Sequence, residues 1–381
     1  MRILFDHQVF SWQRYGGISR YFAEQLRGLK ALDQEVFLPE NFFSENVYLR
    51  EFPEFQRQSL TDFSFKGKKI LQNALGRQNT LMAIDQKKPH VFHPTYFDPY
   101  FLKTLVKKRI PFVLTVHDMI HEIYGHGSGS FFSLDAKVIE NKKFLAEKAA
   151  VVIAVSEHTR QDLLRFCPQL DPGKIMVIHH GNSLKPTSPA STGSTHNSSL
   201  ITLNSSYLLF VGQRKTYKNF AWMIEQLAGL LHSETDLQLI CVGGSAFDKT
   251  ETAQLVRLGL AQKVHYRSVA SDAALANVYS GAAGFIFPSK YEGFGIPVLE
   301  AFACGCPVIL NRSSSLPEVG GDAAVYFDEA NPGGLELAVR RILEDSDFRR
   351  NMVDKGLERV KHFTWAQSAA KHLGVYQSIV N

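Results

Sequence analysis

Two glutamates flank a glycine-containing turn in the segment from Pro288 to Pro307. Glu292 precedes the turn, and Glu300 lies eight positions further on, in a helix expected to begin near Pro297. Proline suits the first helical turn because it has no amide hydrogen. The first amides of a helix and the positive end of its dipole attract phosphate. Glu300 can accept two hydrogen bonds from a vicinal diol such as a ribose, so the segment has the chemistry of a nucleoside diphosphate site.

A second cluster follows an apolar run at residues 207–211. Gly212 ends that run, and Arg214, Lys215 and Lys218 place three cations on one loop. Fixed cations stabilise the negative charge that grows on a departing diphosphate. The loop is therefore a candidate for the leaving-group side of a transfer reaction, with a solvated basic turn as the alternative.

The first half of the chain has weaker signals. Gly16 and Gly17 precede an amphipathic stretch, and glycines allow a backbone to approach a ligand closely. His117 ends an apolar run at residues 112–116. A lone histidine is more often a hydrogen-bonded structural residue, and two adjacent glycines can form a plain turn.

Apolar runs of strand length alternate with amphipathic helical stretches, which indicates parallel sheets covered by helices. The small, polar composition of residues 186–205 predicts a linker between two α/β domains of the doubly wound type. We expect domains at residues 1–185 and 206–365, followed by a terminal helix at 366–381. Ligands of such sheets bind at the carboxyl ends of the strands. The expected strands are residues 3–5, 91–92, 112–116, 151–155, 175–178, 207–211, 237–242, 264–266, 284–287 and 307–310.

Composition excludes several classes. With 381 residues, 45% hydrophobic residues and a net charge of +5, the chain is expected to be globular and gives no sign of nucleic-acid binding. The four cysteines lack the spacing of a zinc site, and we expect no metal and no bound cofactor. No run is long enough to span a bilayer, and we expect a cytoplasmic protein. The basic stretches 65–70 and 103–109 are interpreted as solvated helix faces; a patch facing anionic lipid at the inner membrane face is the sharper alternative.

The segment at 288–307 resembles the Glu-x7-Glu motif of retaining GT-B glycosyltransferases, specifically glycosyltransferase family 4, and the resemblance extends over most of the chain. It implies two Rossmann-like domains that face each other across a cleft, and a terminal helix, here residues 366–381, that packs back on the first domain. It also implies that Glu300 binds the ribose and that Glu292 lies beside the donor sugar. The loop of Gly293, Phe294, Gly295 and Ile296 would hold the diphosphate.

The resemblance assigns roles to the other loops as well. The loop after Gly212 is similar to the family's basic loop, in which a pair of cations contacts the phosphates. Here Lys218 would act with either Arg214 or Lys215, because Tyr217 stands where an arginine often stands. Gly16 and Gly17 match the acceptor-side glycine loop, and His117 would lie beside the donor sugar and the acceptor hydroxyl. The predicted catalytic residues are His117, Arg214, Lys218 and Glu292.

The activity that follows is transfer of a hexose, with retained anomeric configuration, to a saccharide or lipid-linked saccharide in surface polysaccharide synthesis. The surroundings of Tyr96 and Asn182 are similar to bacterial mannosyltransferases, which favours GDP-mannose over UDP-linked donors. Three alternatives remain: a glycoside hydrolase, a sugar-nucleotide epimerase and a non-catalytic nucleotide-sugar-binding module. Hydrolysis is disfavoured because paired carboxyl groups stand roughly 5 to 9.5 Å apart, whereas eight helical residues span about 12 Å. A non-catalytic binding module would be expected to have lost Lys218 or Glu300, and both residues are present.

Overall fold

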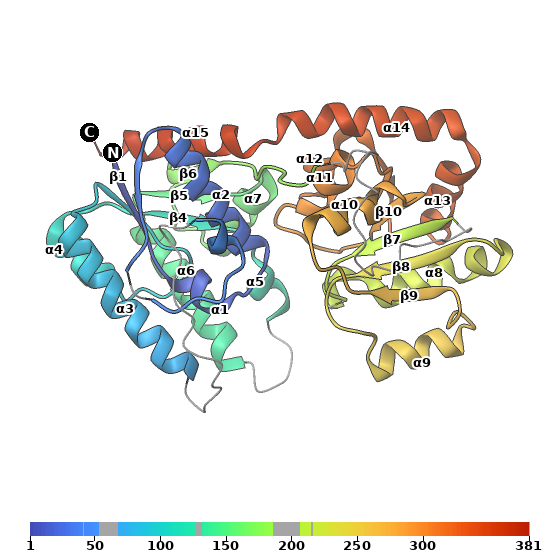
Figure 1. The fold of residues 1–381 in the computed structure, drawn as a ribbon, viewed down its shortest axis with the longest axis horizontal. Helices are drawn as coiled ribbons and strands as arrows, with labels where there is room; N and C mark the ends of the chain where they lie inside the picture. The colour runs from blue at the N-terminus through green and yellow to red at the C-terminus, as the bar shows by residue number, and fades with distance from the viewer. Residues whose placement is uncertain (41, 53–67, 126–131, 186–205, 215, 381) are drawn as a thin grey trace. The chain divides into compact units, whose positions relative to one another are not determined.

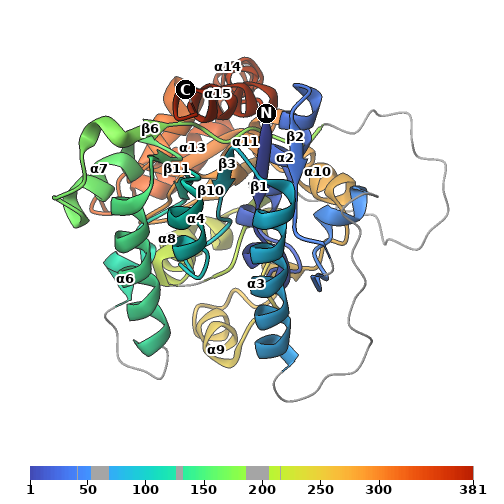
Figure 2. The ribbon, with the colours of Figure 1, turned by 90° about the vertical axis from the view of Figure 1, so that its left-hand side faces the viewer.

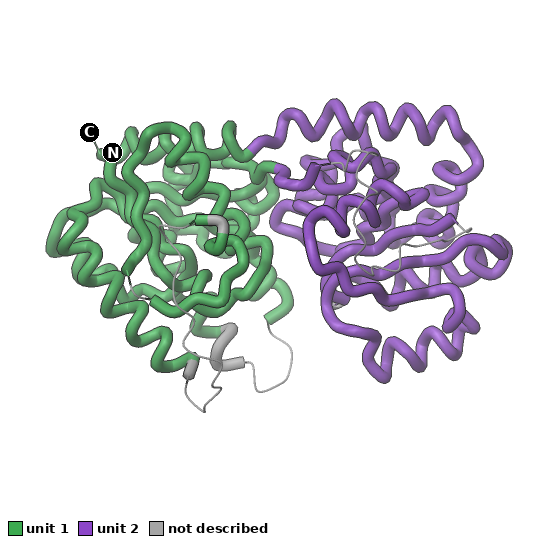
Figure 3. The backbone as a smooth tube through the Cα atoms, in the orientation of Figure 1, with its two compact units in different colours: residues 1–181, 365–381 green, residues 182–364 purple. Residues whose placement is uncertain are grey.

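The computed structural model describes residues 1–40, 42–52, 68–125, 132–185, 206–214 and 216–380 (Figure 1). The chain forms two compact units, which are described separately. Unit 1 contains residues 1–181 and 365–381, and unit 2 contains residues 182–364 (Figure 3). The predicted linker, 186–205, lies outside the described residues.

Unit 1 is built on parallel strands joined by helices. Three strands pair in the order β2-β1-β3 and three in the order β4-β5-β6, and a single bridge between Phe92 and Phe112 connects the two sets. The chain passes from β1 to β2 on one side and then returns to β3 on the other, so the order reverses between β1 and β3. The elements are β1 (Arg2–Phe5), α1 (Gln8–Trp12), α2 (Gly17–Ala31), β2 (Glu35–Phe37), α3 (Lys68–Lys87), β3 (Val91–His93), α4 (Leu102–Lys108), β4 (Val113–Val116), α5 (Ile120–Tyr124), α6 (Phe132–Lys148), β5 (Val151–Ala154), α7 (Glu157–Phe166), β6 (Ile175–Val177) and α15 (Trp365–Ser378).

Unit 2 has one parallel sheet of six strands in the order β12-β11-β10-β7-β8-β9. The order reverses between β7 and β10, which lie side by side in the sheet. The elements are β7 (Tyr207–Val211), α8 (Phe220–Ser233), β8 (Gln238–Val242), α9 (Lys249–Arg257), β9 (Val264–Arg267), α10 (Asp272–Ser280), β10 (Gly284–Phe287), α11 (Ile296–Ala303), β11 (Val308–Asn311), α12 (Leu316–Gly320), β12 (Ala324–Phe327), α13 (Gly334–Glu344) and α14 (Ser346–Arg359).

The predicted α/β class is confirmed, because each unit is built on parallel strands connected by helices. Every expected strand is present, with each end within one residue of its predicted position. Two strands were not expected, β2 and β12. Both lie at the edge of their sheet, and β2 has only three residues, the first of which is the charged Glu35.

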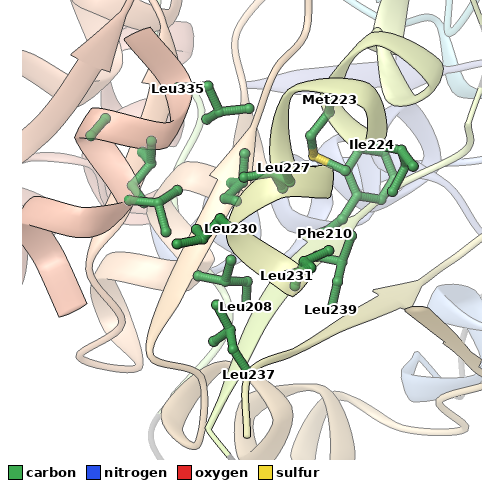
Figure 4. Packing of buried hydrophobic residues seen from close by; sticks show 14 of the residues in the cluster. Leu208, Phe210, Met223, Ile224, Leu227, Leu230, Leu231, Leu237, Leu239 and Leu335 are labelled. Carbon is green, nitrogen blue, oxygen red and sulfur yellow. The ribbon is translucent and has the colours of Figure 1, made fainter. Parts of the chain in front are cut away.

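The core of unit 2 explains why the sheet and its helices form. Leu208 and Phe210 alternate on one face of β7, and α8 covers that face with an apolar stripe that includes Met223, Leu227 and Leu230 (Figure 4). All five side chains are fully buried. This helical and strand periodicity is the sequence pattern that predicted the fold.

The terminal helix α15 packs in unit 1, against α2 (Figures 1 and 2). Gln25 of α2 donates a hydrogen bond to the hydroxyl of Ser368 over 2.9 Å. Trp365 and Tyr376 are part of the apolar core of the unit. The end of the chain is therefore a structural part of the unit with which the chain begins.

Candidate functional site

In unit 2, two loops follow the neighbouring strands β7 and β10 at the point where the strand order reverses. In open α/β sheets this position, outside the carboxyl ends of the strands, is where ligands bind. The amide of Lys290, after β10, donates to the carbonyl of Tyr217, after β7, over 2.8 Å. The two loops are thus held together by a backbone hydrogen bond.

Lys218 and Glu292, one from each loop, form an ion pair. The Nζ atom of Lys218 donates to Oε1 of Glu292 over 2.6 Å, and the two side chains are only 13% and 11% exposed. The ammonium group also lies 5.0 Å from the ring centre of Phe287 at the end of β10. The structure therefore brings together two residues that the sequence predicted for one site, although they are far apart in the chain.

The turn between Glu292 and α11 is fastened by the segment that follows β11. Ser315 donates its hydroxyl to the carbonyls of Glu292 and Phe294, 2.9 Å each. The amide of Glu292 donates to the hydroxyl of Ser314, also over 2.9 Å. Gly295 caps the helix with a φ of 106°, a backbone conformation that favours glycine. This fixed turn leads directly into the N-terminus of α11, where the first amides have no acceptor within the helix.

Glu300 lies one turn into α11 and is 6% exposed. The hydroxyl of Tyr279, on α10, donates to Oε2 of Glu300 over 3.2 Å. Burial, together with the neighbouring Glu300, raises the pKa of Tyr279 well above its usual value, so this hydroxyl stays a donor. Tyr279 was not singled out from the sequence, because a tyrosine in an apolar helix gives no motif.

The contacts of Arg214 lie away from the Lys218–Glu292 pair. Its guanidinium pairs with Glu251 of α9, with an Nε to Oε1 distance of 2.7 Å, and donates to the carbonyls of Gly243, Ser245 and Ala246 after β8. The side chain is 4% exposed. These contacts hold the loop after β8, and they use nearly all of the guanidinium's donors. The alternative cation, Lys215, lies outside the described residues.

In unit 1, His117 directly follows β4. Burial lowers its pKa to about 4, against a weaker opposing effect of Asp118, so the imidazole is neutral near pH 7. Its Nε2 atom is shielded from solvent and has no hydrogen-bond partner in the part of the chain that the structure describes. The rings of Tyr21 and Phe22 contact it edge to face. This histidine is a neutral group, and a ligand would reach its Nε2 atom only after a local movement of the residues that shield it.

Gly16 and Gly17 lie at the start of α2, with Gly16 as the capping residue. The side-chain oxygen of Gln13 accepts a hydrogen bond from the amide of Ser19 over 3.2 Å, and the hydroxyl of Ser19 donates to the carbonyl of Gly16. One amide at this helix terminus is therefore capped by a side chain of the preceding loop.

A buried hydrogen-bond chain that the sequence did not predict links α15 to the strands of unit 1. The chain runs from Tyr376 through His93, Thr115 and Tyr21 to His372. With both histidines neutral, each group donates to the next one: the Tyr376 hydroxyl to Nδ1 of His93, Nε2 of His93 to Thr115, Thr115 to Tyr21, and Tyr21 to Nε2 of His372. This direction is set at the end of the chain, where Nδ1 of His372 donates to the carbonyl of Ser368 over 2.7 Å. A carbonyl can only accept, so in a neutral His372 the Nε2 atom must be an acceptor. Burial lowers the pKa of His372 to about 4 and that of His93 well below its usual value.

The described residues contain no group of three His, Cys, Asp or Glu side chains placed to hold a metal ion. Among the described helices, none combines the length and apolar character that crossing a membrane would need. All four cysteines are buried free thiols.

Comparison with known proteins gives a consistent result for both units. A family model described as "Glycosyltransferase Family 4" matches residues 15–185, and one described as "Glycosyl transferases group 1" matches residues 192–359. The O-antigen chain mannosyltransferase B of Escherichia coli is 25% identical over 99% of this chain and 100% of its own length.

Solved structures resemble the whole fold, as the predicted GT-B class requires. Sucrose-phosphate synthase from Thermosynechococcus elongatus has a TM-score of 0.76 and 19% identity, and the match covers 99% of this chain and 98% of that one. The Anabaena protein Alr3699/HepE, in complex with UDP and glucose, has a TM-score of 0.74 and 17% identity over the full length of both chains.

Proposed function

This chain belongs to glycosyltransferase family 4, and on that basis we propose that it is a retaining, metal-independent hexosyltransferase. The donor is a GDP- or UDP-linked sugar, and the acceptor is a saccharide or a lipid-linked saccharide used in surface polysaccharide synthesis. The O-antigen mannosyltransferase that matches over the full length supports mannose as the sugar. A protein of the same fold that was solved with UDP supports a nucleotide-linked donor.

The observation that carries this proposal is the arrangement of Lys218, Glu292 and the N-terminus of α11 at the switch point of unit 2. A diphosphate placed at α11 would meet the helix amides, the positive end of the dipole and the ammonium of Lys218. Glu300, on the same helix, would accept hydrogen bonds from the ribose hydroxyls. Glu292 holds the ammonium of Lys218 in place through their ion pair.

The reaction breaks the bond between the anomeric carbon and the diphosphate oxygen, and the bonding electrons leave with the diphosphate. The acceptor hydroxyl attacks the same face of the oxocarbenium-like centre, and its proton passes to the departing diphosphate oxygen. Charge grows on the leaving group as the bond breaks. Preorganised positive groups are therefore the main catalytic contribution of this chain, and Lys218 and α11 supply them.

Arg214 takes a less direct role in this proposal than its position in the sequence suggests. Its contacts with Glu251 and with the carbonyls at residues 243–246 make it a positioning residue for the loops after β7 and β8. The phosphate contact that accompanies Lys218 then falls to Lys215.

His117 is proposed to hydrogen-bond a hydroxyl of the sugar or of the acceptor. A neutral imidazole can serve as donor or acceptor depending on its tautomer. Its lowered pKa keeps it neutral through the physiological range, so its hydrogen bonds would not change with pH near 7. Gly16 and Gly17 are proposed to belong to the same acceptor side. Peripheral contact with a membrane through the basic helix α4 is a further proposal, which the exposed Val106 among its lysines supports.

A nucleotide screen by thermal shift, with EDTA present throughout, tests the donor class. A ligand at about 100 times its dissociation constant adds about 2.7 kcal/mol of stability, so GDP or UDP should raise the unfolding temperature clearly. The matching sugar nucleotide is then incubated with saccharide acceptors, and NMR of the anomeric proton reads the new linkage. Transfer with the donor's anomeric configuration, undiminished by EDTA, is expected. Inversion, or activity that returns only with magnesium or manganese, would contradict the proposal.

A further inference from the structure

Unit 1 contains a cavity that none of the residues proposed above lines. It has a volume of about 330 Å³ and lies where α1 follows β1 and where residues 96–98 follow β3. The strand order of the unit reverses between these same two strands. The cavity therefore occupies the position where open α/β sheets bind ligands, and its size is within the range of small-molecule sites. Helices α3 and α6, both visible in Figure 2, supply the remaining lining residues.

An aromatic side chain forms one side of the cavity. Trp12 ends α1 and is 48% exposed. Its ring contacts that of Tyr96 edge to face, with the two ring centres 4.3 Å apart. Large indole rings are usually well covered by protein, and an exposed one beside a concave site offers an apolar surface with a polar edge. The C–H face of a pyranose ring is a natural partner for such a surface.

The rest of the lining is polar and largely fixed in place. Gln8 donates to Asp6 over 2.6 Å and accepts from the amide of Asp98 over 2.9 Å, so its amide is locked between the ends of β1 and β3. Ser11 Oγ and Arg77 Nε are shielded from solvent and have no hydrogen-bond partner within the described ranges. A buried polar group without a partner is costly. Both residues line the cavity, and a ligand hydroxyl would reach either atom only after a local side-chain movement.

The packing behind the cavity is close. Helix α3 passes so near His7 that a Cβ atom at Gly76 would lie 2.1 Å from the imidazole. His7 in turn hydrogen-bonds Thr80 and Asn73 of α3. These contacts hold α3 against the end of β1, so the α3 residues that face the cavity keep a fixed position.

The charges around the cavity do not balance. Arg77 is paired with Asp98. Lys69 of α3 and Lys137 of α6 also line the cavity, are exposed, and have no acidic partner among the residues that the structure describes. Two uncompensated ammonium groups beside a polar cavity favour a ligand with negative charge.

We propose that this cavity is an acceptor subsite for a saccharide that carries a phosphate ester. The sugar ring packs on Trp12, its hydroxyls meet the fixed polar groups, and the phosphate lies near Lys69 and Lys137. This inference rests on the proposed transferase function. Two sources share the chemistry: a free sugar phosphate, and a saccharide joined to a lipid through phosphate.

The test uses the full chain labelled with ¹⁵N at its indole nitrogens. The chain has three tryptophans, and Trp12→Phe assigns the signal of Trp12. Mannose 6-phosphate and a mannose linked through phosphate to farnesol in detergent micelles represent the two sources. Methyl α-mannoside and inorganic phosphate are the controls. We expect at least one sugar phosphate to shift the Trp12 signal at concentrations where both controls leave it in place.

Lys137→Ala should weaken that binding about tenfold, the effect of losing one charge-assisted hydrogen bond. Lys148→Ala, an exposed lysine at the other end of α6, should leave it unchanged. An unshifted Trp12 signal with every sugar phosphate overturns the proposal, as does equal binding of methyl α-mannoside or of inorganic phosphate. Unchanged affinity of Lys137→Ala also overturns it.

The binding of GDP and UDP to unit 2, measured on the same samples, separates the two hypotheses. If a nucleotide binds and the Trp12 signal stays unshifted, the acceptor subsite is wrong and the transferase proposal stands. If neither nucleotide binds, the transferase proposal fails, whatever the sugar phosphates do.

Discussion

Replacing Lys218 with alanine removes the cation that pairs with Glu292. The pair is 2.6 Å long and its side chains are 13% and 11% exposed, so it is far better shielded than a surface ion pair. In the proposed donor complex, the ammonium also faces the departing diphosphate. Removing one preorganised electrostatic contact of this kind costs on the order of 10² to 10³ in rate. We expect Lys218→Ala to lower kcat by that factor.

The loss should appear in kcat and much less in KM for the donor. The leaving group gains charge as the glycosidic bond breaks, so Lys218 interacts more strongly with the transition state than with the bound donor. Initial rates of nucleoside diphosphate release, measured over a range of donor concentrations with a fixed acceptor, separate the two constants. Circular dichroism and thermal unfolding of the variant check that it folds.

Lys355→Ala is the matched control. Lys355 also belongs to unit 2 and pairs with a carboxylate, Asp322, but that partner is 78% exposed. Exposed pairs contribute about 0 to 1 kcal/mol, so turnover should hardly change. Transfer by Lys218→Ala at near the parent rate would mean that the basic loop is a solvated turn and that the leaving group has been placed wrongly.

Three further predictions concern stability. Gly28→Ala should destabilise unit 1 by about 1 to 3 kcal/mol, because its Cβ would lie 2.5 Å from that of Ala369 on α15. Gly374→Ala, in open space on α15, should instead stabilise the unit by up to about 1 kcal/mol. Urea unfolding that shows the same sign for both variants would refute the packing of α15 on α2. Arg214→Ala should cost about 3 kcal/mol in unit 2, because it leaves the Glu251 carboxylate without its buried partner; an unchanged unfolding midpoint would show that these contacts do not hold the loop. Burial lowers the pKa of His372 to about 4, below the value of about 6.5 in an unfolded chain. Between these two pH values the unfolded state binds more protons, so unit 1 should lose stability as pH falls from about 6.5 to about 4. Hydrogen exchange in unit 1 that is equally slow at pH 7 and pH 4.5, after correction for the intrinsic rate, would contradict this.

Much of the fold was predictable because its strands are continuous apolar runs between helices. The turn and the helix between Glu292 and Glu300 were equally predictable, because glycine suits the turn and proline suits the first helical positions. Strand β2 has only two apolar residues after Glu35, which is too few to show a pattern. Its length and edge position do not explain why β12 was missed, because β9 is an edge strand of the same length and was predicted.

The contacts of Arg214 could not be predicted, because they depend on the loop after β8, which is distant in sequence and has no motif. The same reason applies to the chain of hydrogen bonds from Tyr376 to His372, in which polar groups of several elements meet only after folding. The cavity beside Trp12 is a further case, because its residues are spread from position 8 to position 141. Local patterns predict elements and short loops; partners brought together by tertiary packing require the structure.

Calorimetric titration of the full chain with GDP and with UDP, in EDTA, decides whether the donor nucleotide binds at α11. We expect one of the two to bind with one site per chain. Glu300→Ala should weaken that binding roughly tenfold to a hundredfold, because the ribose hydroxyls lose a charged acceptor that contributes about 1.5 to 3 kcal/mol. Binding of neither nucleotide, or binding that Glu300→Ala leaves unchanged, would contradict the placement of the donor on α11.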